Sequence, residues 1–196
     1  MAVWLARAGA HGEREELALD QELAVIGWWE LPDLSGVTSR DDLEALYREV
    51  FPDASRGLVA NHVGQLWAFI HRIQPGDLVI LPLKRRAAIA IGEVTGPYHH
   101  RPDLPEDARH TRPVRWLTKD MPRNRFDQDL LYSLGAFMTV CQIQRNNAAQ
   151  RIRALLAGQP PPPRADGEGT DDEMCLGFIG MVFDNENLPL RARPVK

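Results

Sequence analysis

Cysteine is nearly absent from this 196-residue chain, and long apolar runs are missing altogether. Two cysteines, Cys141 and Cys175, cannot build a disulfide framework, and without a C-x-x-C spacing they do not indicate a zinc site. We expect both to be reduced packing residues. No stretch reaches the roughly 20 apolar residues of a membrane span, and the start of the chain does not resemble a signal peptide. These absences predict a cytoplasmic protein that does not enter a membrane.

The motifs of the common catalytic sites are also missing. A nuclease of the restriction type needs a Glu-x-Lys or Gln-x-Lys triplet to bring a carboxylate and a lysine to a metal, and neither occurs. No Gly-x-Ser-x-Gly elbow, phosphate-binding loop or dinucleotide fingerprint is found. His99, His100 and His110 have no further ligand at a familiar spacing, so we expect them in a solvated loop. We therefore predict no catalytic activity, no metal and no cofactor.

Positive charge is concentrated in the middle of the chain. The net charge is -4, but residues 54–158 hold 15 lysines and arginines against 8 acidic residues, whereas residues 1–53 hold 4 against 12. The central cations include Lys84, Arg85, Arg86, Arg101, Arg109, Arg112, Arg115, Lys119, Arg123 and Arg125. Such a group is typical of a surface that binds a polyanion, although solvated loops can have the same composition.

Composition divides the chain into one domain and a tail. Hydrophobic residues make up 44% of the sequence and charged residues 26%, as in ordinary globular proteins. We assign residues 1–158 to a single domain, residues 159–173 to a proline-rich and then acidic linker, and residues 174–196 to a short apolar extension. The extension is too short for a core of its own, so it is expected to dock on the domain or to pair with a partner.

Hydrophobic periodicity predicts an α+β domain. Short β-branched or aromatic runs predict strands over residues 3–6, 23–26, 78–81, 88–94 and 114–117. Helical spacing predicts helices over residues 13–20, after a cap at Ser39, through Val63 and Trp67, and from Ala148 to Gly158. We expect a strongly curved antiparallel sheet or small barrel with helices around it.

Several aromatic and polar residues lie at the ends of these elements. Trp28 and Trp29 follow a predicted strand, and in extended chain only one of the two can point inward. Tyr98 follows a Gly-Pro turn that could aim its ring at a site, and Asn61 is expected to cap the helix that carries Trp67. The other tryptophans are expected in the core, namely Trp4, Trp67 and Trp116.

An ordered series of motifs resembles a known family. The series is Val3–Gly9, Val25–Trp28, Asn61–Phe69, Gly76–Val79, Pro82–Lys84, Gly96–Tyr98 and Arg112–Leu117. In this order it resembles the N-terminal EVE-like domain of Mrr-type restriction system proteins, a branch of the PUA superfamily. The resemblance extends over about 155 residues, from Trp4 to Gly158.

The resemblance implies a curved β-barrel that holds a flipped, modified base against aromatic side chains. It implies that Trp28 is the first residue of the base pocket. The residues implied to complete the pocket are Arg7, Gly9, Asn61 and Tyr98. The residues implied to contact phosphates are Lys84, Arg85, Arg86 and Arg115.

The function that follows is a non-catalytic sensor in a modification-dependent restriction or defence system. Modified cytosine in DNA is the expected ligand. In Mrr-type proteins this module precedes a nuclease domain, whereas here we expect either a separately encoded nuclease as partner or a degenerate remnant. Two alternatives stay open: a reader of modified RNA of the YTH type, and a protein-interaction adaptor whose apolar segment 174–183 adds to a partner's sheet.

Overall fold

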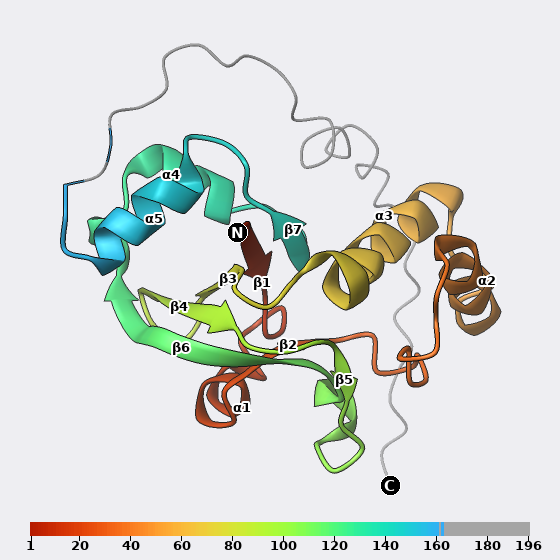
Figure 1. Cartoon of the computed structure of the whole chain (residues 1–196). Coiled ribbons are helices and arrows are strands. Elements are labelled where there is room, and N and C mark those ends of the chain that lie inside the picture. The colour runs from red at the N-terminus through yellow and green to blue at the C-terminus, as the bar shows by residue number, and fades with distance from the viewer. Residues whose placement is uncertain (161, 163–196) are drawn as a thin grey trace, which may run out of the picture.

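A single curled sheet organises the computed structural model, which describes residues 1–160 and 162 (Figure 1). The strands are β1 (Val3–Ala6), β2 (Leu23–Ile26), β3 (Leu78–Pro82), β4 (Ala88–Val94), β5 (His99–His100), β6 (His110–Pro122) and β7 (Val140–Gln142). The α-helices are α1 (Glu15–Asp20), α2 (Arg40–Val50), α3 (Arg56–Trp67), α4 (Gln128–Leu134) and α5 (Ala148–Leu156). Short helical turns lie at Ala68–Arg72, Glu106–Ala108 and Arg123–Arg125.

The strands lie in the order β2-β6-β4-β3-β1-β7, and β5 also pairs with β6. The 13-residue β6 pairs with β2 and β5 through its first residues and with β4 through the rest, so it belongs to both halves of the sheet. Register shifts between Ile89 and Gly92 bend its pairing with β4. The sheet consequently curls into a half-barrel with helices around it, as the sequence predicted (Figure 1).

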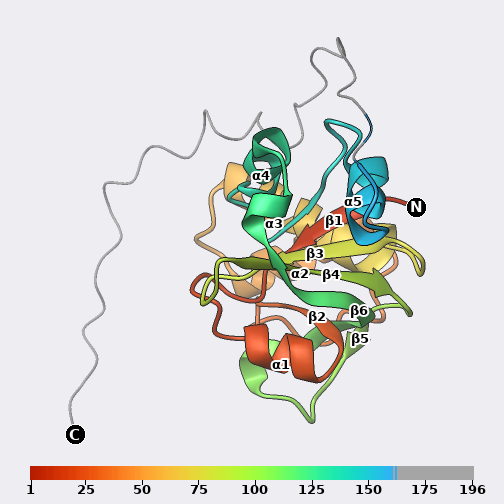
Figure 2. The same ribbon diagram turned by 90° about the vertical axis from the view of Figure 1, so that its left-hand side faces the viewer.

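Alternating side chains place a core on each face of the sheet. On one face Leu5, Ile80 and Ile91 pack with residues of α4 and α5. On the other face Trp4 and Val79 pack with residues of β2 and of helices α1 to α3. Figure 2 shows α4 and α5 on one side of the strands and α1 on the other. Because both faces are covered, β3 is apolar along its whole length and β4 is apolar from Ala88 to Ile91.

Two of the helices, α2 and α3, begin at serine caps. Ser39 caps α2 by accepting a hydrogen bond from the amide of Asp42, as predicted. Ser55, and not Asn61, caps α3, because its hydroxyl accepts from the amide of Leu58. The expectation that Asn61 is a cap is therefore wrong, since this residue lies inside the helix.

A buried arginine closes the end of the α3 helix. Arg112 of β6 is almost fully buried and donates hydrogen bonds to the carbonyls of Phe69, Ile70 and Gly96. Two of these carbonyls belong to the π-helical turn that continues α3, where helix carbonyls lack partners of their own. Burial lowers the pKa of Arg112 to about 10, so the group still carries its charge at neutral pH. Arg112 is thus part of the core and does not form the polyanion surface.

The structure confirms some of the remaining predictions and corrects others. Cys141 and Trp116 are buried as expected, whereas Trp67 is only partly buried. The sheet is not purely antiparallel, because β1 and β3 pair in parallel. His99 and His100 form β5 and His110 is buried in β6, so the predicted solvated loop is wrong.

The tail is largely outside the described residues. The linker over residues 159–173 is described only at residues 159, 160 and 162, and Cys175 and the apolar extension over residues 174–196 lie outside that part. In the described part of the chain no helix is long and apolar enough to cross a membrane.

Candidate functional site

Trp28 has a backbone conformation that a bulky side chain rarely adopts. It follows β2 and has a φ of 62°, in the left-handed region where glycine is favoured. A non-glycine residue there costs on the order of 1–3 kcal/mol, and such residues gather at functional sites. The chain at Trp28 is therefore not extended, and its side chain is aimed by the turn.

His62 holds the indole ring of Trp28, and Tyr47 holds His62 in turn. The Trp28 Nε1–H donates to Nδ1 of His62 over 3.2 Å, and the Tyr47 hydroxyl lies 2.6 Å from the same nitrogen. The rings of Trp28 and His62 meet edge to face, with centroids 5.1 Å apart. An indole N–H only donates, so Nδ1 of His62 is unprotonated and the proton of the neutral ring lies on Nε2. Burial lowers the pKa of His62, which favours this neutral form.

A second chain of hydrogen bonds holds the backbone of Trp28. The Trp28 carbonyl lies 3.2 Å from Nε2 of His110, and a carbonyl only accepts, so this nitrogen carries the proton. Nδ1 of the neutral ring then accepts from the Tyr98 hydroxyl over 2.7 Å, and the hydroxyl accepts from the amide of Leu34. Burial lowers the pKa of His110 to about 4 and raises that of Tyr98.

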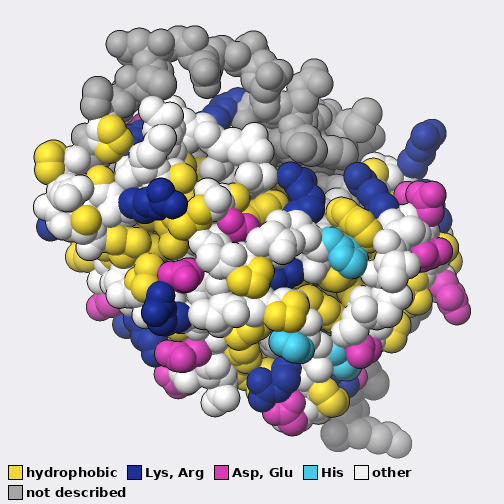
Figure 3. Space-filling view, viewed as in Figure 1, with side chains coloured by type: hydrophobic (Ala, Val, Ile, Leu, Met, Phe, Trp, Pro, Cys, Tyr) yellow, Lys and Arg dark blue, Asp and Glu magenta, His cyan; other side chains and the backbone are white. Residues whose placement is uncertain are grey.

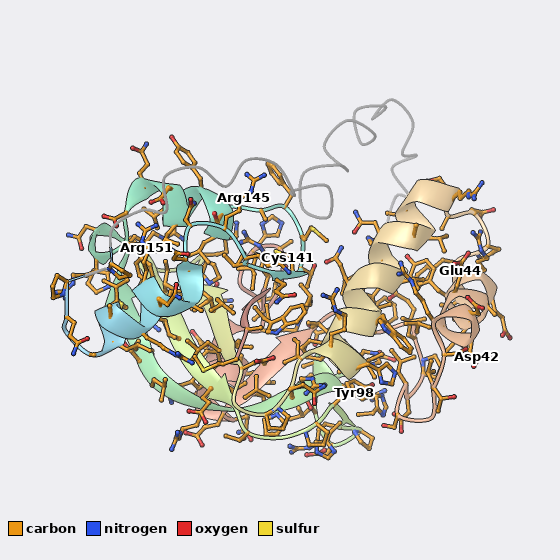
Figure 4. The ribbon with its side chains drawn as sticks, turned by 45° about the horizontal axis from the view of Figure 1, so that its top comes forward. Asp42, Glu44, Tyr98, Cys141, Arg145 and Arg151 are labelled. Atoms are coloured by element: carbon orange, nitrogen blue, oxygen red, sulfur yellow. The ribbon has the colours of Figure 1, made fainter. Side chains whose placement is uncertain are left out.

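Tyr98 therefore acts on Trp28 through His110 and presents little of its own ring. It is buried, and Figure 4 shows it near the C-terminal end of α3, where its ring meets that of Phe69. Trp28 itself is partly exposed and packs against the larger core, while Trp29 is 51% exposed. Of the two neighbouring tryptophans, Trp28 has a ring held by the protein and Trp29 has a ring on the surface.

Of the other predicted pocket residues, Asn61 is next to a residue of this cluster. Asn61 precedes His62 on α3, and its side-chain oxygen accepts from Gln65. Arg7 follows β1, but its guanidinium donates to three carbonyls of the loop between α4 and β7. Gly9 has a φ of 105°, and a Cβ there would meet the carboxylate of Glu13.

The predicted phosphate contacts do not form one patch. Lys84, Arg85 and Arg86 occupy the turn between β3 and β4, whereas Arg115 pairs with Glu93 at the opposite end of β4. Arg85 and Arg86 form exposed ion pairs with Glu16 and Asp120. The face in Figure 3 shows lysine and arginine side chains interspersed with carboxylates.

The β3–β4 turn is also remote from Trp28 along the sheet. The turn adjoins the last residue of β6, because Ala88 pairs with Pro122. Ile26, two residues before Trp28, pairs with the first residue of β6, His110. The two points are twelve positions apart along β6, but α1 links them more directly. Glu15 accepts a hydrogen bond from the Lys84 amide, and the guanidinium of the preceding Arg14 lies beside Gly27.

Three residues that make the cluster specific were not predicted from the sequence. Tyr47, His62 and His110 each appeared as ordinary helix or loop residues, because their partners lie 15 to 82 positions away in the chain. The one available signal was that His62 follows Asn61 in the Asn61–Phe69 motif. Among residues 1–160 and 162 no group of three or more His, Cys, Asp or Glu side chains could hold a metal ion. The cluster offers aromatic faces and neutral hydrogen-bonding groups, which suit a planar polar ligand.

Comparison with known families adds one match. The model of a family described as a domain of unknown function (DUF8426) matches residues 3–142. The matched range includes every residue of the Trp28 cluster and ends with β7, before α5. No curated protein matches the sequence.

Proposed function

The chain belongs to the DUF8426 family, a domain family of unknown function, and we propose that this protein is a non-catalytic module that binds nucleic acid and recognises a modified base. The base would be flipped out of the helix and stacked on Trp28. The ligand we propose is modified cytosine in DNA, and the fold we propose is the EVE-like branch of the PUA superfamily.

The conformation of Trp28 is the observation that carries this proposal. A strained backbone persists only where surrounding contacts compensate for it. Here His110 holds the Trp28 carbonyl, His62 accepts from the ring nitrogen, and Tyr47 in turn bonds His62.

The core tryptophans Trp4 and Trp116 also donate their ring N–H, to Asp77 and to the Ala18 carbonyl, so a bonded ring nitrogen alone indicates no ligand. Trp28 differs from them in its left-handed backbone, its bonded carbonyl and its partly exposed ring. A ring that is fixed and still accessible suits a ligand, because it loses no freedom on binding.

Base stacking makes use of such a ring. A base taken out of a duplex loses a few kcal/mol of stacking and pairing, and an aromatic platform returns about 1–3 kcal/mol of it. The neutral His62 has its Nε2–H directed away from Trp28 and Tyr47, so it can donate to the edge of a bound base. The platform and this donor together would distinguish bases by shape and by hydrogen bonding.

The proposed role of the Lys84–Arg86 turn is contact with phosphates away from the base. Its side chains are exposed, and among the described residues Lys84 has no ion-pair partner. Such contacts would add affinity that falls with salt and does not depend on the base.

Two neighbouring tryptophans provide the test. Trp28→Ala is expected to lower affinity for a duplex with one modified cytosine by about tenfold or more, and to abolish the preference over the unmodified duplex. Trp29→Ala, the matched control, removes an exposed ring of the same kind and is expected to keep the preference. Both affinities are measured by fluorescence anisotropy. Equal effects of the two substitutions would contradict the role of Trp28, and tighter binding of matched single-stranded RNA would favour an RNA ligand.

A further inference from the structure

Phe137 is fully exposed in the loop between α4 and β7. Its relative exposure is 100%, against 72% for Tyr132, the other strongly exposed aromatic residue nearby. The hydroxyl of Tyr132 accepts a hydrogen bond from Gln128, so this ring has a partner on its own helix. A phenylalanine side chain wholly in water gains nothing from the hydrophobic effect. The exposure of Phe137 therefore calls for a reason.

The loop that carries Phe137 is held tightly from beneath. The guanidinium of Arg7 donates to the carbonyls of Leu134, Ala136 and Met138, over 2.9, 2.8 and 3.2 Å. These carbonyls lie on both sides of Phe137 in the chain. A single planar side chain thus fixes the backbone before and after the exposed ring.

A second anchor fixes the end of the same loop. Gln65 of α3 is buried, and its side-chain oxygen accepts from the amides of Thr139 and Val140 over 2.8 and 3.0 Å. The amide of Arg7 donates to the carbonyl of Thr139. Mobile loops have few such contacts, whereas this loop has its backbone bonded at five positions between Leu134 and Val140.

The same glutamine connects the loop to the Trp28 cluster. Its side-chain nitrogen donates to Asn61 one turn earlier on α3, and the next residue, His62, holds Trp28. In Figure 4, Cys141, which follows this loop on β7, lies between the α4–α5 pair and α3. Phe137 therefore projects from a rigid loop that is bonded to the helix supporting Trp28.

We propose that Phe137 inserts into the base stack of duplex DNA and fills the space left by the base that stacks on Trp28. This inference rests on the proposed function. A flipped base leaves a gap in the stack, and apolar side chains inserted between base steps replace part of the lost stacking. An exposed ring on a fixed backbone serves this purpose, because it is already ordered and desolvates on insertion.

The test compares duplex and single-stranded DNA that carry the same modified cytosine. Phe137→Ala is expected to weaken duplex binding by about tenfold while it leaves single-strand binding within about twofold, because a single strand has no stack to fill. Phe137→Trp is expected to restore duplex binding. Tyr132→Ala, the matched control, is expected to change neither affinity. Fluorescence of 2-aminopurine placed beside the modified base reports flipping directly, and its rise should be smaller with Phe137→Ala.

The outcomes separate the two proposals. Duplex binding by Phe137→Ala equal to that of the unchanged protein would overturn the role of Phe137 and leave the base site standing. An equal loss on duplex and single strand would overturn it as well, since the ring would then belong to the base site itself. If the unchanged protein fails to prefer the modified duplex, the proposed function fails and this inference with it.

Discussion

Acidification should weaken the fold through His110, which connects the backbone of Trp28 to Tyr98. Its side chain is 1% exposed, and its pKa is lowered from 6.5 to about 4, chiefly by burial. Electrostatic repulsion from His100 acts in the same direction. Above pH 6.5 the ring is neutral in both the folded and the unfolded chain. Between pH 6.5 and about 4 only the unfolded chain binds the proton, so the free energy of unfolding falls as the pH falls. At ~1.4 kcal/mol per pH unit the total loss is about 3 kcal/mol.

The substitution His110→Gln distinguishes the contribution of His110 to the pH dependence of stability from that of the carboxylates, which titrate in the same pH range. In His110→Gln the amide nitrogen can still donate to the Trp28 carbonyl but does not bind a proton in this range. Urea unfolding at a series of pH values gives the free energy of unfolding of both proteins. We expect the advantage of the unchanged protein over the variant to shrink by about 3 kcal/mol from pH 7 to pH 4. Parallel pH profiles for the two proteins would refute the assignment of a buried, neutral His110.

Two further substitutions test the fold that supports the site. Arg112→Met removes the donors to three buried carbonyls and is expected to cost at least about 3 kcal/mol in urea unfolding; a loss below about 1 kcal/mol would contradict the structural role of this cation. Gly92→Ala places a Cβ 2.3 Å from Val114 Cγ1 and 2.8 Å from the ring of Trp116, and is expected to lower stability by about 1–3 kcal/mol. The control Gly36→Ala has open space around its Cβ and should be nearly neutral, so equal effects would speak against this packing.

Local signals were sufficient for most elements of the fold. β1, β2 and β4 lie where β-branched and apolar runs predicted them, and Ser39 caps its helix as expected. The prediction for β6 was too short. The strand begins four residues earlier, at His110, and continues through Thr118–Pro122, where Lys119, Asp120 and Pro122 are exposed. Pairing with β4 keeps this last part in the sheet, which no local pattern shows. α4 and β7 were missed for the same reason, since long-range contacts with β1 hold them.

The site depended even more on distant contacts. The Trp28–Trp29 pair could be singled out because two adjacent tryptophans cannot both be buried in extended chain, and the family resemblance then selected Trp28. Its positive φ, and the tethers from His62 and His110, arise from residues 34 and 82 positions away. Arg7 was expected to border the base and instead fixes the loop of Phe137, because the carbonyls it bonds lie more than 125 positions along the chain. Such pairings become visible only in the folded structure.

The central claim is that Trp28 forms part of a site for a modified base. The most direct test is fluorescence-anisotropy binding of the unchanged protein to duplexes that differ in one base: cytosine, methylated cytosine, hydroxymethylated cytosine or methylated adenine, each at two salt concentrations. We predict a clear preference for a duplex with one modified cytosine that persists at both salt concentrations, because stacking and shape determine it. Equal binding of all four duplexes, or no binding, would contradict the claim.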